Sequence, residues 1–226
     1  MTGSMPGAVP RPTVPRLHVL TSDAVIARPD FVATASDLLR AMGPRGALHL
    51  RTRVLSGRDM FALTTHLLEV SRSAHATLVI NERVDVALAA GADAVQLGRG
   101  ALQVDDVSRM LSRGMRIGMS VHTPAEARAA EDAARSRGDS TGRLDWLMVG
   151  HIFATESHPN DPGRGVELVH AVRKVTTIPV IAVGGITPDR VPALRAAGAS
   201  GVAAIAGIWD ERSPKDAAIH YLTVVW

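Results

Sequence analysis

The stretch that decides the fold is residues 179–208, which read PVIAVGGITPDRVPALRAAGASGVAAIAGI. It holds two short apolar β-type runs, 179–183 and 201–205, with a helix-type run between them and a turn of small residues after each. Parallel strands joined by crossover helices produce this alternation. The same unit recurs back along the chain as far as Leu17.

The number of such units identifies the architecture. Helix-type runs, from 31–42 to 214–222, follow the β-type runs, which are 17–20, 47–50, 77–80, 94–97, 116–120, 146–149, 179–183 and 201–205. Eight units in a chain close to the usual length of about 250 residues predict a single (β/α)8 TIM barrel of the α/β class. We expect the barrel to span 17–226. Residues 1–16, rich in Pro and Gly, predict a disordered N-terminal arm, and either Met1 or Met5 could be the natural start.

Composition narrows the function classes. The 226 residues are 46% apolar and 21% charged, which fits one globular domain. With 25 basic against 22 acidic residues and 3% aromatics, nucleic-acid binding is disfavoured. The absence of cysteine excludes disulfides and thiolate metal sites, and it is typical of a reducing compartment, so we expect a cytoplasmic protein. No apolar run approaches the roughly 20 residues of a membrane span. The sequence leaves open whether the protein forms a homo-oligomer.

One helix start is marked by its own chemistry. Thr123-Pro124-Ala125-Glu126 combines an N-cap hydroxyl, a proline at the first helical position and a glutamate three residues after the cap, which together predict a capping box. The loop before this helix belongs to the face where strands end. In a barrel of this kind, that face carries function and the opposite face carries stability.

Small-residue turns after the last two β-type runs predict a phosphate site. These turns are Gly184-Gly185 and Ala206-Gly207, where missing side chains let an anion approach backbone amides. The hydroxyls of Thr155 and Ser157 could close the other side of the phosphate. Glycine used only for tight turns remains the alternative.

A histidine at the end of the fifth β-type run is the candidate acid-base residue. His122 directly precedes a helix, and a helix N-terminus favours the neutral imidazole that can accept or donate a proton. A histidine that only bonds its own loop is the alternative. His151 continues into apolar residues, which favours a structural or lining role.

Other residues at the strand ends could bind a ligand, but the sequence does not assign each of them one role. Arg51 could bind a carboxylate, whereas Arg53 is interpreted as a surface residue. Asn81 and Glu82 could handle a substrate hydrogen bond or a proton. Because Glu82 is the main strand-end carboxylate, we predict no metal.

In this order, the motifs resemble the thiamine phosphate synthase superfamily, and most closely its TenI-type thiazole tautomerases. The segments that carry the resemblance are 50–53, 79–88, 95–97, 118–122, 149–156, 163–166 and 178–186. In synthases that this chain resembles, an Asn-Asp pair stands at Asn81-Glu82 and a further aspartate lies within 98–101. The resemblance assigns to those acids the magnesium that escorts pyrophosphate. Where those synthases have Thr-x-Thr-Lys, residues 155–158 of this chain read TESH and lack the lysine.

The resemblance thus implies a phosphate pocket without pyrophosphate machinery. We expect a cofactor-independent isomerase of thiamine biosynthesis that aromatises a carboxylated thiazole phosphate tautomer. His122 would move the proton and Arg51 would meet the substrate carboxylate. The expected partner is this small molecule, with no nucleic acid and no membrane, and a homo-oligomer is possible. The alternatives are a weak or relic thiamine phosphate synthase, a phosphate-sugar isomerase, and a non-catalytic phosphate-ligand-binding regulator on the same barrel.

Overall fold

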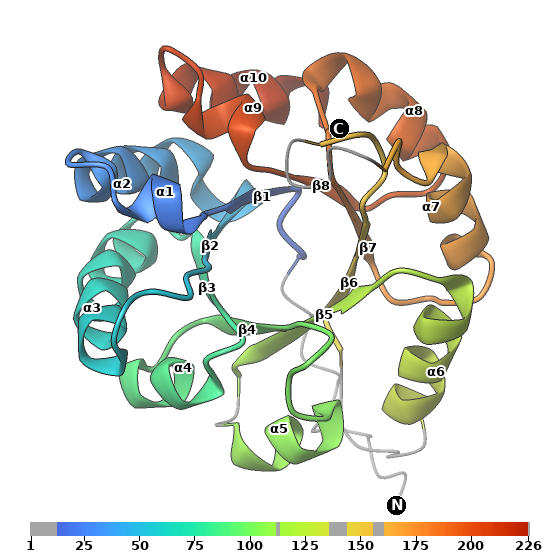
Figure 1. Ribbon diagram of the computed structural model, residues 1–226, viewed down its shortest axis with the longest axis horizontal. Coiled ribbons are helices and arrows are strands. Elements are labelled where there is room, and N and C mark those ends of the chain that lie inside the picture. Colours follow the sequence, from blue (N-terminus) through green and yellow to red (C-terminus); the bar gives the residue numbers. More distant parts are fainter. Residues whose placement is uncertain (1–12, 112–113, 136–143, 156–160, 226) are drawn as a thin grey trace, which may run out of the picture.

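The computed structural model describes residues 13–111, 114–135, 144–155 and 161–225, and within them the chain forms one closed barrel (Figure 1). Its parallel strands pair in sequence order, and β8 returns to pair with β1. The strands are β1 (Leu17–Leu20), β2 (Gly46–Leu50), β3 (Thr77–Asn81), β4 (Ala94–Leu97), β5 (Arg116–Val121), β6 (Trp146–Gly150), β7 (Val180–Val183) and β8 (Gly201–Ala204). The predicted (β/α)8 barrel is confirmed.

Helices surround the strands on the outside of the ring (Figure 1). They are α1 (Asp23–Ile26), α2 (Phe31–Met42), α3 (Gly57–Ser73), α4 (Val84–Ala90), α5 (Val104–Met110), α6 (Pro124–Arg135), α7 (Gly165–Arg173), α8 (Val191–Ala196), α9 (Ala206–Trp209) and α10 (Pro214–Val224), with the 3-10 turns Gly43–Arg45 and Pro188–Arg190. The first predicted helix matches α2, and the last ends at Val224 rather than at Leu222. The sequence did not predict α1 and α9, because four residues are too few for a helical period.

The buried residues form two layers, as the alternation of side chains along a strand requires. The larger layer lies between the strands and the helices. The smaller one fills the barrel and includes Trp146, Met148 and Ile181. Gly118 makes room there, because a Cβ at this position would lie 2.1 Å from the indole nitrogen of Trp146.

Buried polar residues share the smaller layer. His18 on β1, His49 on β2 and Gln96 on β4 are each at most 1% exposed. The closed strands therefore hold a polar interior alongside the apolar one.

The predicted arm is shorter than 1–16. Val14 packs against the cluster inside the barrel, and Pro15 is buried. The backbone of Arg16 donates to Arg45 O at 2.7 Å and accepts from Val202 N–H at 2.9 Å. These bonds extend the pairing around β1, so 14–16 belong to the barrel, whereas residues 1–12 lie outside the described part.

Across the described ranges, no helix combines the length and the apolar character that crossing a bilayer demands.

Candidate active site

The parallel strands bring most predicted site residues to one end of the barrel. Asn81 is the last residue of β3, and His122 directly follows β5. His151 follows β6 and Gly184 follows β7. All of them lie where strands end, which is the end that carries function in barrels of this type.

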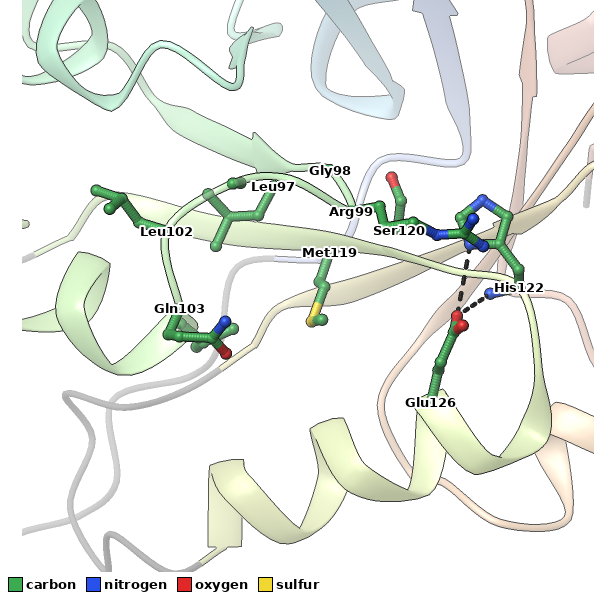
Figure 2. Close-up of a pocket in the computed structure, with 11 residues that line it drawn as sticks. Leu97, Gly98, Arg99, Leu102, Gln103, Met119, Ser120, His122 and Glu126 are labelled. Atoms are coloured by element: carbon green, nitrogen blue, oxygen red, sulfur yellow. Dashed lines mark hydrogen bonds and ion pairs between the residues drawn. The ribbon is translucent and has the colours of Figure 1, made fainter.

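His122 is held by the helix that follows it. Its backbone N–H donates to Glu126 Oε2 at 2.6 Å, and its ring nitrogen Nδ1 lies 3.4 Å from the same oxygen (Figure 2). The predicted cap is present, since Glu126 N–H donates to Thr123 Oγ1 at 3.1 Å. The carboxylate of Glu126, however, reaches back to His122 rather than to Thr123. This bond fixes the loop that carries the histidine.

The carboxylate beside His122 stays ionised. Partial burial raises the pKa of Glu126, but the hydrogen bond from the His122 backbone, the His122 ring and the charge of Arg99 together hold that pKa below its ordinary value. His122 therefore has an anionic neighbour, a partner that the sequence analysis did not assign to it.

A pocket of about 210 Å³ opens beside this pair. Figure 2 shows His122 and Glu126 at one end of it and Leu102 and Gln103 at the other. The lining residues come from the end of β4, the loop before α5, the end of β5 and the start of α6, and they include the apolar Leu97 and Met119. A ligand with an apolar part and a polar or charged part fits such a lining.

Two buried hydrogen-bonded chains reach the same end from inside the barrel. In one, His49 connects His18 to the side chain of Asn81. In the other, Gln96 connects Trp146 to Ser120. The sequence analysis missed the four interior residues and Ser120. For His18, His49 and Gln96, a detectable signal was a polar residue inside an otherwise apolar β-type run, because these side chains face the barrel interior.

Glu82 and Arg99 lie where the resemblance drawn from the sequence implies a magnesium site. Glu82 is exposed, with φ at 64°, and its Oε1 lies 2.6 Å from the position of a Cβ on Gly98. The next residue is Arg99, a cation, and not an acid. No group of three or more His, Cys, Asp or Glu side chains that could hold a metal occurs within the part of the chain that the structure describes. The residues placed here do not fit a magnesium ion, and we assign no step to one.

Arg51 directly follows β2, the neighbouring strand, and is half-buried. Asp23 accepts from Thr52 Oγ1 at 2.6 Å and from Arg53 N–H at 2.8 Å. These two hydrogen bonds, together with the positive charge of Arg51, hold the pKa of Asp23 below its ordinary value. The charges of Asp23 and Arg51 thus already act on one another, and the binding of a substrate carboxylate by Arg51 remains a prediction.

Close packing accounts for the glycines of the predicted phosphate turns. A Cβ on Gly184 would lie 2.4 Å from His151 Cβ, and one on Gly185 would lie 2.5 Å from Ala154 O. A Cβ on Gly207 would lie 2.5 Å from Tyr221 Oη. Gly184 and Gly185, both at positive φ, are therefore required by the neighbouring segment, whereas Gly207 packs against the end of a side chain. The phosphate role of these turns remains a prediction.

The other predicted residues on this side divide between packed and exposed positions. Ala206 begins α9 and is exposed. Thr155 is half-buried, and Ser157 lies outside the described residues. The His151 side chain is 14% exposed, with Nε2 at 3.3 Å from Asp161 Oδ1, so it packs among the loops.

The strands form a closed parallel barrel, and polar side chains gather where the strands end. The protein is therefore a (β/α)8 barrel whose site is formed by the loops that follow the strands. The sequence then specifies the family. The chain belongs to the thiamine monophosphate synthase family, which residues 17–208 match.

Individual relatives agree with this assignment. The chain is 37% identical over 182 residues to the thiamine-phosphate synthase of Methanoculleus marisnigri, covering 79% of this chain and 82% of the relative. It is 35% identical over 173 residues to that of Natronomonas pharaonis, covering 75% and 77%. The solved thiamine phosphate pyrophosphorylase of Pyrococcus furiosus superposes with a TM-score of 0.78 at 26% identity, covering 93% of this chain and 95% of that one.

The expectation of an isomerase that aromatises a thiazole phosphate tautomer is wrong. The relatives at 30–37% identity are named for the synthase reaction, which is a group transfer and not an isomerisation. The error arose because three departures at loop positions outweighed motifs that run through the whole barrel. The strand-end motifs are compatible with both chemistries, so local spacing could not separate them.

Proposed function

We propose that this protein makes thiamine phosphate by joining a thiazole phosphate to a pyrimidine that carries a diphosphate on its exocyclic methylene carbon. The thiazole nitrogen attacks that carbon, the carbon–oxygen bond to the diphosphate breaks, and its electron pair leaves with pyrophosphate. The observation that carries this proposal is the identity of 35–37% to thiamine-phosphate synthases, spread over about three-quarters of the chain.

The chain's own side chains supply binding and orientation. Asn81 and Ser120 offer hydrogen bonds to a ring held over the barrel, and orientation of this kind lowers the barrier of a group transfer. Arg99 is an exposed guanidinium on the wall of the pocket. A guanidinium binds phosphate oxygens with two parallel hydrogen bonds, so Arg99 is suited to hold the diphosphate and to stabilise the charge that develops as it leaves.

The direct test supplies both substrates to the purified protein, with and without magnesium, and measures thiamine phosphate and pyrophosphate together. Equal amounts of the two products are expected. If neither product forms in either condition, the proposal fails. Tight binding of the thiazole phosphate without turnover would instead support the regulator.

Arg99→Ala tests the diphosphate contact. Loss of a hydrogen-bonded charge pair predicts that the KM for the diphosphate substrate rises roughly tenfold or more. Arg109→Ala is the matched control, because Arg109 is exposed on α5 and pairs with Asp106 away from the pocket lining. Equal KM values for the two variants would remove Arg99 from the site.

A further inference from the structure

A chain of buried polar groups runs through the barrel from the face where strands begin to the face where they end. His18 Nε2 lies 3.1 Å from Pro15 O, and His18 Nδ1 lies 2.8 Å from His49 Nε2. His49 Nδ1 lies 3.0 Å from the terminal amide of Asn81, at the atom assigned as Oδ1. Both rings are 0% exposed.

The number of hydrogens decides which way each bond points. Three hydrogen bonds need three hydrogens, and two neutral imidazoles carry only two. Pro15 O can only accept, so His18 must carry its hydrogen on Nε2, which leaves His18 Nδ1 to accept. His49 must then carry its hydrogen on Nε2, and its Nδ1 has none to give. The third hydrogen has to come from the Asn81 amide, whose oxygen and nitrogen are interchangeable in shape.

The surroundings keep both rings neutral. Burial lowers the pKa of His18 well below its ordinary value, and His49 and Arg116 lower it further, against the bond to Pro15 O. Burial also lowers the pKa of His49 to about 4, against the bond to Asn81. Trp146 packs on both rings, with centroids 5.3 Å from His18 and 6.4 Å from His49.

Arg116 is the charged group that acts on His18, and the carboxylates of Asp145 and Asp93 act on Arg116 in turn. A positive charge near His18 opposes an imidazolium there. The charges around the pair therefore agree with two neutral rings.

The second interior chain is fixed in the same way. The indole of Trp146 can only donate, and its Nε1 lies 2.8 Å from Gln96 Oε1. Gln96 Nε2 must then be the donor to Ser120 Oγ, at 3.0 Å. The Ser120 oxygen accepts that bond, and its own hydrogen is left to donate. Figure 2 shows Ser120 near His122 at the pocket.

We propose that these two chains set the hydrogen-bonding polarity of the site, so that Asn81 presents its carbonyl oxygen and Ser120 presents its hydroxyl hydrogen to the ligand. Asn81 of β3 pairs with Gln96 of β4 in the sheet, and Ser120 is hydrogen-bonded to the Gln96 side chain. Asn81 and Ser120 are therefore both neighbours of Gln96. The site is then complementary to a ring edge that carries a hydrogen-bond donor next to an acceptor. His18, His49, Gln96 and Trp146 are positioning residues in this scheme. That the ring belongs to a substrate rests on the proposed function, whereas the positions of the hydrogens do not.

The hydrogens can be observed directly by nitrogen NMR of protein labelled with 15N-histidine. We expect both buried rings to carry hydrogen on Nε2 and none on Nδ1 between pH 6 and 8. His49→Gln and His18→Gln assign the signals, and His66→Gln, at an exposed position on α3, is the matched control. If a variant does not fold, coupling through the hydrogen bond between the two rings assigns them in the wild-type protein. A hydrogen on His49 Nδ1, alone or on a doubly protonated ring, overturns the proposal.

Asn81→Asp is the sharper variant, because a carboxylate accepts and cannot donate. We expect His49 to gain a hydrogen on Nδ1 in this variant at pH 7. If Asn81 already presented its oxygen to His49, the His49 signal would stay as in the wild type, and the proposal would fail. Asn81→Leu, which removes both functions of the amide, should leave His49 Nδ1 bare.

Kinetics separate positioning from packing. In His49→Gln, the KM for the ring-bearing substrates should rise roughly fivefold or more through loss of one oriented hydrogen bond, with kcat little changed. A loss of folded protein alone would lower the apparent kcat at constant KM, which would contradict a positioning role. Absence of all turnover in the wild type would refute the proposed function and leave the NMR result standing.

Discussion

At the scale of the residue, the site is determined by where hydrogens and charges can reside. His122 shows this at the surface of the pocket, where Glu126 holds both its backbone and its ring. His49 shows it in the interior, where burial excludes the charged ring and thereby constrains Asn81. Asn81 and His122 were predictable from the sequence because they end β-type runs. Glu126 was predicted as well, but as a partner of Thr123 in the capping box and not of His122. His49 was not predicted, because a contact between two strands is not encoded in local spacing.

The buried His49 predicts a pH dependence of stability. Its pKa is about 4 in the folded chain against an ordinary value of 6.5, so the unfolded chain takes up a proton first as the pH falls. The contribution of neutral His49 to the free energy of unfolding is complete above pH 6.5 and is lost between pH 6.5 and about 4. By pH 5 the loss is about 2 kcal/mol. His18 is shifted in the same direction and adds to the effect.

Urea unfolding at pH 7 and pH 5 measures this loss. His49→Gln should show a smaller drop in the free energy of unfolding than the wild type, because the titrating ring is gone. His66→Gln should keep the wild-type drop, since that ring is exposed. Equal drops in all three proteins would show that His49 is not the titrating group.

At the scale of the element, the barrel strands depend on matched large and small residues across their inner faces. The runs of apolar residues were sufficient to predict all eight strands to within a residue or so at each end. The same runs could not predict that Gly118 lies under Trp146, because β5 and β6 are separated by a helix and pair only in the closed sheet. Periodicity thus identifies strands, whereas the fit between strands needs the register.

Gly118→Ala tests that fit. The added methyl group would lie 2.1 Å from Trp146 Nε1 and 2.3 Å from Gln96 Oε1, so the interior chain to Ser120 must shift. We expect a loss of about 1–3 kcal/mol in the free energy of unfolding. Gly100→Ala is the control, because a methyl group there meets no described atom within 4 Å. Thermal unfolding of the two variants measures this difference. Equal unfolding midpoints would mean that the barrel interior accommodates the methyl group without strain.

At the scale of the whole molecule, the two ends of the barrel have separate duties. The strand ends carry Asn81, Ser120 and His122, and the opposite end carries structural contacts such as the one made by Glu131 of α6. This carboxylate is 6% exposed. It accepts from Thr176 Oγ1, from Thr177 N–H at 2.9 Å and from Thr177 Oγ1 at 2.8 Å. It thus fastens α6 to the loop that enters β7.

This division predicts opposite effects for substitutions at the two ends. Glu131→Ala leaves three donors without their acceptor, which should cost about 2–3 kcal/mol of stability while the KM values stay within about twofold of the wild type. Asn81→Leu should instead raise KM with a smaller effect on stability. Urea unfolding and steady-state kinetics on both variants test the division. A KM change in Glu131→Ala as large as that in Asn81→Leu would mean that the two ends are coupled through β7 and its loops, and that the strand-end site depends on how α6 is anchored below it.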